Sequence, residues 1–235
     1  MKIKGSVALV TGANRGLGAA FARGLLAAGA TRVYAAARDP GTVSLPGALP
    51  VRLDVTQPDQ VAALVRDLGD VTLIVNNAGI FEAGPLLASG SIDALYRQFD
   101  TNAVGPLRLV QAFAPVLAAN GGGAVVNVLS VLSWLTLANV SGAYSASKAA
   151  GWALSNALRQ ELKAQRTELL SVHAAFIDTD MARGVPGPKI TPEEVVRQAL
   201  AALEAGQPEL LADPISHNVH AGLVAEPRVY VGAAA

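Results

Sequence analysis

The chain of 235 residues is 51% hydrophobic and only 15% charged, which fits one globular domain over residues 1–235 and argues against intrinsic disorder. Its 18 basic and 18 acidic residues balance, so it lacks the excess positive charge that nucleic-acid binding requires. The absence of cysteine excludes disulfides, thiolate catalysis and cysteine-ligated zinc, and it fits a cytoplasmic location.

Residues 109–147 carry no charge, which raises the question of a membrane span. Pro115, Asn120 and three successive glycines interrupt this stretch, so no segment offers about 20 consecutive apolar residues. We therefore expect buried core here and no membrane insertion. The apolar run that follows the first five residues is too short for a signal peptide.

Short apolar runs alternate with helical patterns along the first part of the chain. We expect strands over 6–10, 32–37, 50–53 and 71–75. We expect one helix over 19–28 and another whose apolar stripe runs from Val61 to Leu68, with Thr56 as its N-cap.

The alternation continues in the second part. A long helix is expected over 91–117 with Asn102 near its middle, and the helix that contains Tyr144 should run to about residue 165. Further expected elements are strands over 124–129, 169–176 and 209–212 and a helix over 191–205. This order predicts an α/β fold with a doubly wound parallel sheet and a ligand site beyond the carboxyl ends of its strands.

A glycine-rich turn, Thr11-Gly12-Ala13-Asn14-Arg15-Gly16-Leu17-Gly18, lies between the first expected strand and helix. Glycines allow the backbone to approach a pyrophosphate, and the start of the helix attracts its negative charge. A tight turn with close helix packing would require the same glycines. The turn by itself therefore does not distinguish pyrophosphate binding from a purely structural role.

Tyr144 and Lys148 lie four residues apart at the start of a helical pattern and should share one helix face. A tyrosine pKa of about 10 must fall by roughly 3 for catalysis near neutrality. We expect Lys148, helped by a positively charged cofactor, to lower it. A chance pair on an exposed helix is the alternative.

Five motifs follow the order and nearly the spacing of one enzyme family: Thr11-Gly12-x-x-x-Gly16-x-Gly18, Asn76-Asn77-Ala78-Gly79, Asn102, Ser130 and Tyr144-x-x-x-Lys148. On these motifs the chain resembles the short-chain dehydrogenase/reductase family, in its shorter single-domain subfamily, over nearly its whole length.

The resemblance implies a catalytic mechanism. The Ser130 and Tyr144 hydroxyls would hold a carbonyl oxygen, a nicotinamide would deliver hydride, and Tyr144 would supply the proton. Lys148 would lower the Tyr144 pKa and bind the ribose, and Asn102 would hold a relay water. Cofactor contacts are expected at Gly12, Asn14, Arg15, Gly16, Leu17, Gly18, Arg38, Asp54, Val55, Asn77, Ala78, Gly79, Tyr144, Lys148, Ile177 and Thr179.

The sequence departs from the family pattern in three places. Ser130 precedes Tyr144 by fourteen positions instead of the usual thirteen, which makes Ser133 a rival for the substrate-binding serine. Ala174-Ala175 replaces the usual Pro-Gly, and only about ten residues separate Met181 from Thr191, so the substrate lid should be short.

The end of the second expected strand predicts the cofactor. An acidic residue there would favour NAD, but the position holds Ala37. Arg38 and Arg15 are placed to contact the 2′-phosphate that only NADP carries, so we expect NADP. Asp39 is the complication, since it either folds back to the ribose or pairs with Arg38 in solvent.

We expect an NADP-dependent carbonyl reductase or alcohol dehydrogenase for a small to medium apolar substrate. The expected pocket wall is Phe81, Leu132, Trp134, Leu135, Val140, Phe176 and Met181, although core packing is an equal reading for Leu132 and Leu135. The alternatives are a 3-oxoacyl-thioester reductase and a non-catalytic NADP-sensing protein.

No metal site is expected, because His173, His217 and His220 are scattered along the chain. The resemblance also implies a homo-oligomer, either a tetramer or a dimer, that pairs through the two long helices. The expected contacts there are Leu107, Phe113, Ala149, Trp152 and Ala153.

Overall fold

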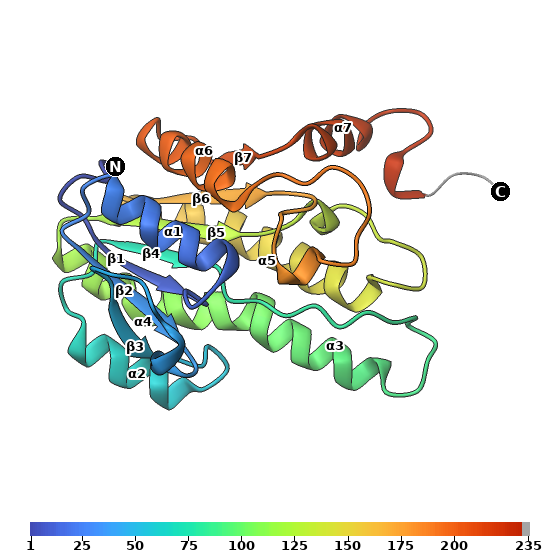
Figure 1. The fold of residues 1–235 in the computed structure, drawn as a ribbon. Coiled ribbons are helices and arrows are strands. Elements are labelled where there is room, and N and C mark those ends of the chain that lie inside the picture. The colour runs from blue at the N-terminus through green and yellow to red at the C-terminus, as the bar shows by residue number, and fades with distance from the viewer. Residues whose placement is uncertain (232–235) are drawn as a thin grey trace.

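The computed structural model describes residues 1–231, whose strands form one seven-stranded sheet in the order β3-β2-β1-β4-β5-β6-β7 (Figure 1). All neighbouring strands are parallel. The strands are β1 (Val7–Thr11), β2 (Arg32–Ala37), β3 (Leu49–Arg52), β4 (Leu73–Asn76), β5 (Gly123–Val128), β6 (Thr167–His173) and β7 (Glu209–Leu211). This order confirms the predicted doubly wound, Rossmann-type sheet.

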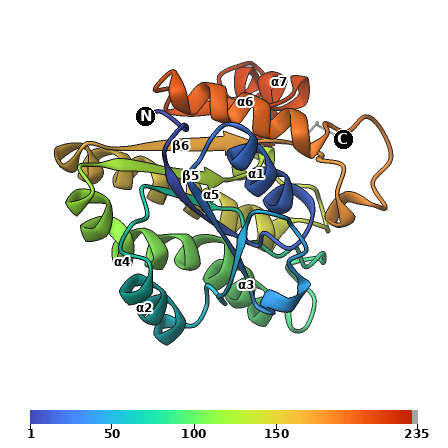
Figure 2. The ribbon, with the colours of Figure 1, turned by 60° about the vertical axis from the view of Figure 1, so that its left-hand side comes forward.

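Helices cover both faces of the sheet (Figures 1 and 2). They are α1 (Gly16–Ala27), α2 (Pro58–Asp67), α3 (Ser91–Phe99), α4 (Gly105–Ala119), α5 (Gly142–Glu161), α6 (Pro192–Glu204) and α7 (Pro214–Gly222). One hydrophobic core joins α1 and α6 to the sheet, and a second joins α2, α4 and α5 to the opposite face. None of the helices within residues 1–231 has the length and apolar character to cross a membrane.

The burial of each strand follows its place in the sheet. All four residues of β4 at the centre are buried, whereas the edge strand β3 has no buried residue. Because both faces of the central strands are covered, those strands read as continuous apolar runs instead of alternating ones.

The helix predicted over 91–117 is not continuous. A π-helical turn over Asp100–Val104 separates α3 from α4, and the Gly105 amide donates to the carbonyl of Asp100. Pro106 lacks the amide hydrogen that the carbonyl of Asn102 would accept in an uninterrupted helix. Asn102 therefore lies in a local irregularity, a kind of structure that is frequent at functional sites.

Other predicted boundaries also need correction. The sixth strand begins at Thr167 and ends at His173, so Phe176 lies in the following loop. Thr56 is not the N-cap of α2, because Gln57 holds that position and the Thr56 hydroxyl donates to Asp54 at 2.7 Å. Helix α7 was not predicted.

Candidate active site

The glycine-rich turn joins β1 to α1 and has a backbone shape that only glycine suits. Gly16 has a φ of +53°, and a side chain at Gly18 would collide with the carbonyl of Gly12. No side chain caps the first turn of α1, so its amide groups remain available to an anion. Asn14, Arg15 and Leu17 lie within this turn.

Thr11 and Asn77 tie the glycine-rich turn to the end of β4. The Thr11 hydroxyl accepts from the amides of Asn77 and Ala78, both at 2.9 Å. The Asn77 side chain donates back to the carbonyls of Thr11 and Gly12 at 2.9 and 3.3 Å. The predicted cofactor residues from these two segments are thereby held side by side.

The side chain of Asn102 fixes the chain that follows this junction. Its Oδ1 accepts from the Ile80 amide at 2.9 Å, and its Nδ2 donates to the Ile80 carbonyl at 2.9 Å and to the Ser147 hydroxyl at 3.0 Å. Because these bonds occupy the side chain, the backbone carbonyl of Asn102 is the group that is left to accept a hydrogen bond from a water. That carbonyl faces α5, since an added Cβ at Gly151 would lie 3.5 Å from it.

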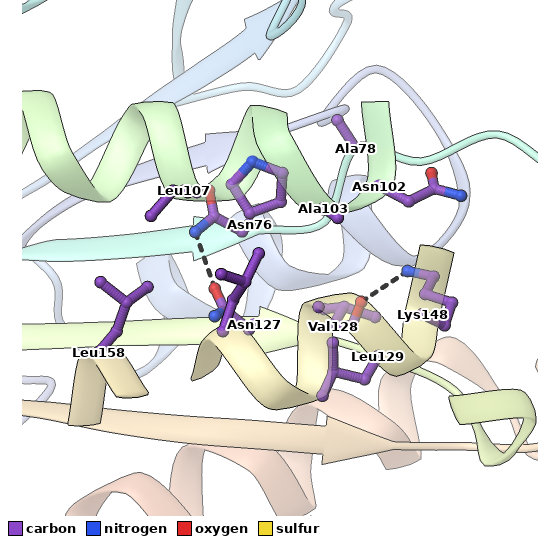
Figure 3. Close-up of a pocket in the computed structure, with 13 residues that line it drawn as sticks. Asn76, Ala78, Asn102, Ala103, Leu107, Asn127, Val128, Leu129, Lys148 and Leu158 are labelled. Carbon is purple, nitrogen blue, oxygen red and sulfur yellow. Dashed lines mark hydrogen bonds between the residues drawn. The ribbon is translucent and has the colours of Figure 1, made fainter. Parts of the chain in front are cut away.

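Tyr144 and Lys148 share one face at the start of α5, as their spacing predicts. The Lys148 ammonium lies 5.7 Å from the Tyr144 ring centroid and donates to the Val128 carbonyl at 2.8 Å (Figure 3). Both residues are buried, with 9% and 5% of their surfaces exposed. This arrangement contradicts the reading of a chance pair on an exposed helix.

Burial dominates the electrostatics of this pair. It raises the pKa of Tyr144 to about 12, although the Ser130 hydroxyl acts in the opposite direction, and it lowers the pKa of Lys148 to about 8. In the chain without a cofactor, burial therefore outweighs the effect of Lys148, and the expectation that Lys148 and a positively charged cofactor together lower the pKa of Tyr144 stays a prediction.

A small cavity lies between β4, β5, α4 and α5, next to Lys148 and Asn102 (Figure 3). It leaves about 10 Å³ for the centre of a water-sized molecule, which is near the minimum for one water. Asn76 and Asn127 line its inner end, where the Asn76 amide donates to Asn127 at 2.8 Å.

The two candidate serines have different surroundings. Ser130 follows β5, and its hydroxyl accepts from the Leu132 amide at 3.1 Å and acts on the pKa of Tyr144. The Ser133 hydroxyl is buried with no hydrogen-bond partner within residues 1–231. This geometry favours Ser130 as the residue that meets a substrate beside Tyr144.

A hydrophobic cluster lies behind Ser130. It includes Val131, Trp134 and Val219, with Leu132 and Leu135 packed against it, so the core reading of those two leucines fits. His173 is fully buried and stacks on Trp134 at 4.0 Å. Its Nδ1 lies 3.2 Å from the Ser130 carbonyl, which is an acceptor and so requires Nδ1 to carry the proton.

The predicted adenosine end of the site is more exposed. Arg38 is exposed and has no ion-pair partner within residues 1–231, whereas Arg15 pairs with Asp180 at 3.2 Å in solvent. The carboxylate of Asp39 accepts from the Gly41 amide at 3.0 Å and forms no ion pair with Arg38 within the described residues, whereas its contact with a ribose stays a prediction.

Two further predicted cofactor residues follow β3. The carboxylate of Asp54 accepts from both the amide and the hydroxyl of Thr56. The Val55 carbonyl accepts from Arg108 of α4. Hydrogen bonds to Thr56 therefore hold the side chain of Asp54, and Arg108 of α4 holds the backbone at Val55.

Ile177 and Thr179 lie opposite the glycine-rich turn. An added Cβ at Gly16 would lie 3.3 Å from the Thr179 side chain. Ile190 closes the base of the short lid, because its amide donates to Phe176 and its carbonyl accepts from Asp178, both at 2.9 Å. The glycine-rich turn and this loop thus lie close together at Gly16 and Thr179.

The structure gathers most predicted site residues, but it also reveals three that the sequence did not indicate. These are Gln98 and Pro106, on the interrupted helix, and His173 behind Ser130. Only Pro106 carried a local signal, as a proline inside a helical pattern. Within residues 1–231, no three His, Cys, Asp or Glu side chains are grouped to hold a metal ion.

The donor set fits a phosphorylated dinucleotide. The glycine at position 18 allows α1 to begin directly against the Gly12 carbonyl, and the uncapped amides of the first turn of α1 suit a pyrophosphate. Arg38 offers an exposed guanidinium next to Ala37, the position where an acidic residue would select NAD, whereas that of Arg15 is paired with Asp180. The residues present therefore fit a nicotinamide dinucleotide that carries an additional phosphate.

Comparisons with known proteins agree with this geometry. The family model described as short chain dehydrogenase matches residues 6–188. A short chain dehydrogenase from Burkholderia cenocepacia J2315, solved in complex with NADP, is 40% identical with a TM-score of 0.91, covering 97% of this chain and 96% of that one. Cis-4-hydroxycyclohexanecarboxylate dehydrogenase of Sinomonas cyclohexanicum is 33% identical over 225 residues, 89% of this chain and 87% of that protein. The 3-oxoacyl-[acyl-carrier-protein] reductase of Salmonella typhimurium is 31% identical over 195 residues, 79% of each. The chain therefore belongs to the short-chain dehydrogenase family of oxidoreductases.

Proposed function

We propose that this chain is an NADP-dependent oxidoreductase that interconverts an apolar ketone or aldehyde and the corresponding alcohol. One observation carries the proposal: the buried phenol of Tyr144 lies by the Ser130 hydroxyl and one helical turn before the buried ammonium of Lys148. A buried acid, a second hydroxyl donor and a cation at the carboxyl edge of the sheet are the groups that carbonyl reduction requires.

Each of these residues has a distinct role in the proposed reaction. Ser130 and Tyr144 donate hydrogen bonds to the carbonyl oxygen and stabilise the negative charge that develops there. Bound NADPH supplies hydride to the carbonyl carbon. Tyr144 then gives its phenolic proton to the oxygen, and alcohol oxidation follows the same path in reverse.

The proton on Tyr144 is replaced from the side of Lys148. The cavity beside Lys148 has room for one water, and the Asn102 carbonyl, which Pro106 leaves without a helical partner, faces the same region. A water held between this carbonyl and the ammonium would be one member of a relay that brings a proton from solvent, through Lys148, to Tyr144. The irregular turn at Asn102 thereby contributes to proton transfer.

The preference for NADP rests on charge at the end of β2. Ala37 offers no carboxylate to a ribose, Asp39 is occupied by its own turn, and Arg38 is exposed. The Burkholderia cenocepacia structure that contains NADP supports the same choice. Arg15 would have to leave Asp180 to reach a 2′-phosphate, an exchange that costs little because the ion pair is exposed.

An apolar substrate fits the side chains around Tyr144. The Phe81 ring lies edge-on to that of Tyr144 at 5.0 Å, and Phe176 is half-buried nearby in the chain that leads to the lid. Val140 and Met181 are 40% and 54% exposed. No charged residue occurs between 131 and 144, so this wall offers nothing to pair with a charged substrate.

A panel of ketones, aldehydes, secondary alcohols and oxoacyl thioesters, followed by NADPH absorbance, tests the proposal. Turnover of apolar ketones with wild-type protein is expected. Tyr144→Phe keeps the ring and removes the acid, so turnover should fall roughly 10²- to 10⁴-fold while NADPH affinity changes little. Wild-type-like turnover by this variant would exclude Tyr144 as the acid.

Two alternatives remain as outcomes of the same panel. The similarity to the Salmonella typhimurium enzyme favours testing 3-oxoacyl thioesters, and a kcat/KM for them well above that for ketones would replace the proposed substrate class. Tight NADPH binding without turnover of any compound would point to a non-catalytic NADP-sensing protein.

We also propose that the chain forms a homo-oligomer through α4 and α5. A surface groove between these helices is lined by Leu107, Val110, Ala114, Leu158 and Leu162, among other residues. The expected contribution of Phe113 needs correction, because this residue is fully buried within the chain and cannot contact a partner.

A further inference from the structure

Gln98 makes the same pair of backbone contacts with Glu82 that Asn102 makes with Ile80. Its Oε1 accepts from the Glu82 amide at 3.0 Å, and its Nε2 donates to the Glu82 carbonyl at 3.2 Å. Gln98 is fully buried, so both ends of its amide are satisfied by this one residue. Two side chains one helical turn apart thus hold two alternate residues of the segment Ile80–Glu82.

Phe81 lies between the two held residues. Because both backbone groups of Ile80 and of Glu82 are bound to the helix, the backbone on either side of Phe81 is held in place and the origin of its side chain is fixed. The Phe81 ring lies perpendicular to the Tyr144 ring, with 5.0 Å between the centroids. The Gly84 amide donates to the Val140 carbonyl at 2.9 Å, which ties the same segment to the loop before Tyr144.

Within residues 1–231, the side chain of Glu82 is held by a bidentate pair with Arg97, whose Nε and Nη2 donate at 3.0 and 2.6 Å. This pair is partly exposed and screened by solvent, and it holds the side chain of Glu82, not its backbone. The backbone bonds to Gln98 are buried, and a buried amide group that loses its partner is costly. The position of Phe81 against Tyr144 therefore depends on Gln98 more than on the ion pair.

We propose that Gln98 is a positioning residue of the reaction, which acts through the backbone of Glu82 to hold Phe81 against the ring of Tyr144. This inference rests on the proposed function of Tyr144. Phe81 shields the phenol from water and forms one wall beside it. Without Gln98, Phe81 would move, water would reach Tyr144, and the substrate would lose part of its orienting surface.

Gln98→Met tests the proposal because it keeps the length of the side chain and removes both hydrogen bonds. With an apolar ketone, kcat/KM should fall on the order of 10- to 100-fold, as expected when reacting groups are misplaced by a fraction of an ångström to an ångström. The NADPH dissociation constant should stay unchanged. Gln198→Met is the matched control, since its amide donates to Glu194 and Ala212, away from Tyr144.

A double-variant cycle separates this role from general structural support. If Gln98 acts through Phe81, then Gln98→Met combined with Phe81→Ala should lose no more activity than Phe81→Ala alone. Independent losses that multiply would overturn the proposal, as would wild-type kcat/KM in Gln98→Met. Should Gln98→Met not fold, Gln98→Glu, which keeps the acceptor for the Glu82 amide but replaces the donor to its carbonyl, should lower kcat/KM below that of the wild type and show the same non-additivity with Phe81→Ala.

Titration of the Tyr144 phenol provides a readout that does not depend on turnover. The ultraviolet titration of each protein, minus that of its Tyr144→Phe counterpart, isolates this phenol. The Tyr144 phenol should ionise at a lower pH in Gln98→Met than in the protein with Gln98, because water reaches the phenolate and stabilises it. An unchanged titration would overturn the inference even if no substrate is turned over, whereas a shifted titration without turnover would sink only the proposed function.

Discussion

Lys148 is expected to destabilise the folded chain, so its replacement by methionine should stabilise it. Burial lowers the pKa of Lys148 from 10.5 to about 8, because the ammonium loses hydration that the unfolded chain provides. The unfolded state therefore binds more protons than the folded state between these two values. Stability should rise with pH through this window, and the full cost should be present below pH 8.

The magnitude follows from the two pKa values. The lowering of the Lys148 pKa from 10.5 to about 8 corresponds to a loss of about 3 kcal/mol in the free energy of unfolding, which Lys148→Met would recover. The same substitution removes the hydrogen bond to Val128, which costs about 1 kcal/mol. The variant should thus be more stable by about 2 kcal/mol at pH 7. For a chain of this length, that is about 4 to 8 °C in Tm.

Denaturant unfolding of both proteins between pH 7 and pH 10 measures this difference. The advantage of Lys148→Met should shrink steadily as the pH passes 8 and approaches 10.5. Lys163→Met, which replaces an exposed lysine, should change stability by less than about 0.5 kcal/mol at every pH. A Lys148→Met protein that is no more stable at pH 7, or an advantage that does not depend on pH, would refute the reasoning.

Three further predictions concern cofactor, serine and assembly. Arg38→Ala should lower kcat/KM for NADPH roughly 10- to 150-fold and leave kcat/KM for NADH unchanged, since it removes one charge-assisted contact to the 2′-phosphate. An unchanged ratio of these two kcat/KM values would exclude that contact. Ser130→Ala should slow turnover by an order of magnitude or more, while Ser133→Ala should leave it close to wild type; the reverse ranking would assign the role to Ser133. Light scattering should give a multiple of the 24.0 kDa chain mass, and Ala153→Glu on the exposed side of α5 should reduce it to one chain; a monomeric wild type would remove the proposed interface.

The parts of the site that the sequence predicted depend on local geometry. Tyr144 and Lys148 share a face because the helix period alone places residues four apart together. The glycine-rich turn was predictable because a strand, a turn and a helix follow one another within a short stretch. Buried parallel strands then required the residues at their carboxyl ends to meet along one edge.

The parts that the sequence did not predict depend on contacts between distant segments. The apolar periodicity over 91–117 continues through the π-helical turn, so the pattern did not predict this interruption. Pro106 was the only local sign of it. Gln98 looks like an ordinary polar helix residue until Glu82, sixteen residues earlier, is placed beside it. The burial that raises the pKa of Tyr144 in the chain without cofactor was not predicted, because the sequence indicates the neighbouring charge but not the depth of burial.

Burial of Tyr144 has a consequence for the direction of the reaction. Burial raises the pKa of Tyr144 well above neutrality, so the chain by itself keeps the phenol protonated at pH 7. Carbonyl reduction needs that acid, whereas alcohol oxidation needs the phenolate. In the proposed reaction, the positive charge of an oxidised cofactor bound beside Tyr144 would favour the phenolate that alcohol oxidation requires. The reduced form lacks this charge, so in the proposed carbonyl reduction burial would keep the proton on Tyr144 until a carbonyl oxygen accepts it.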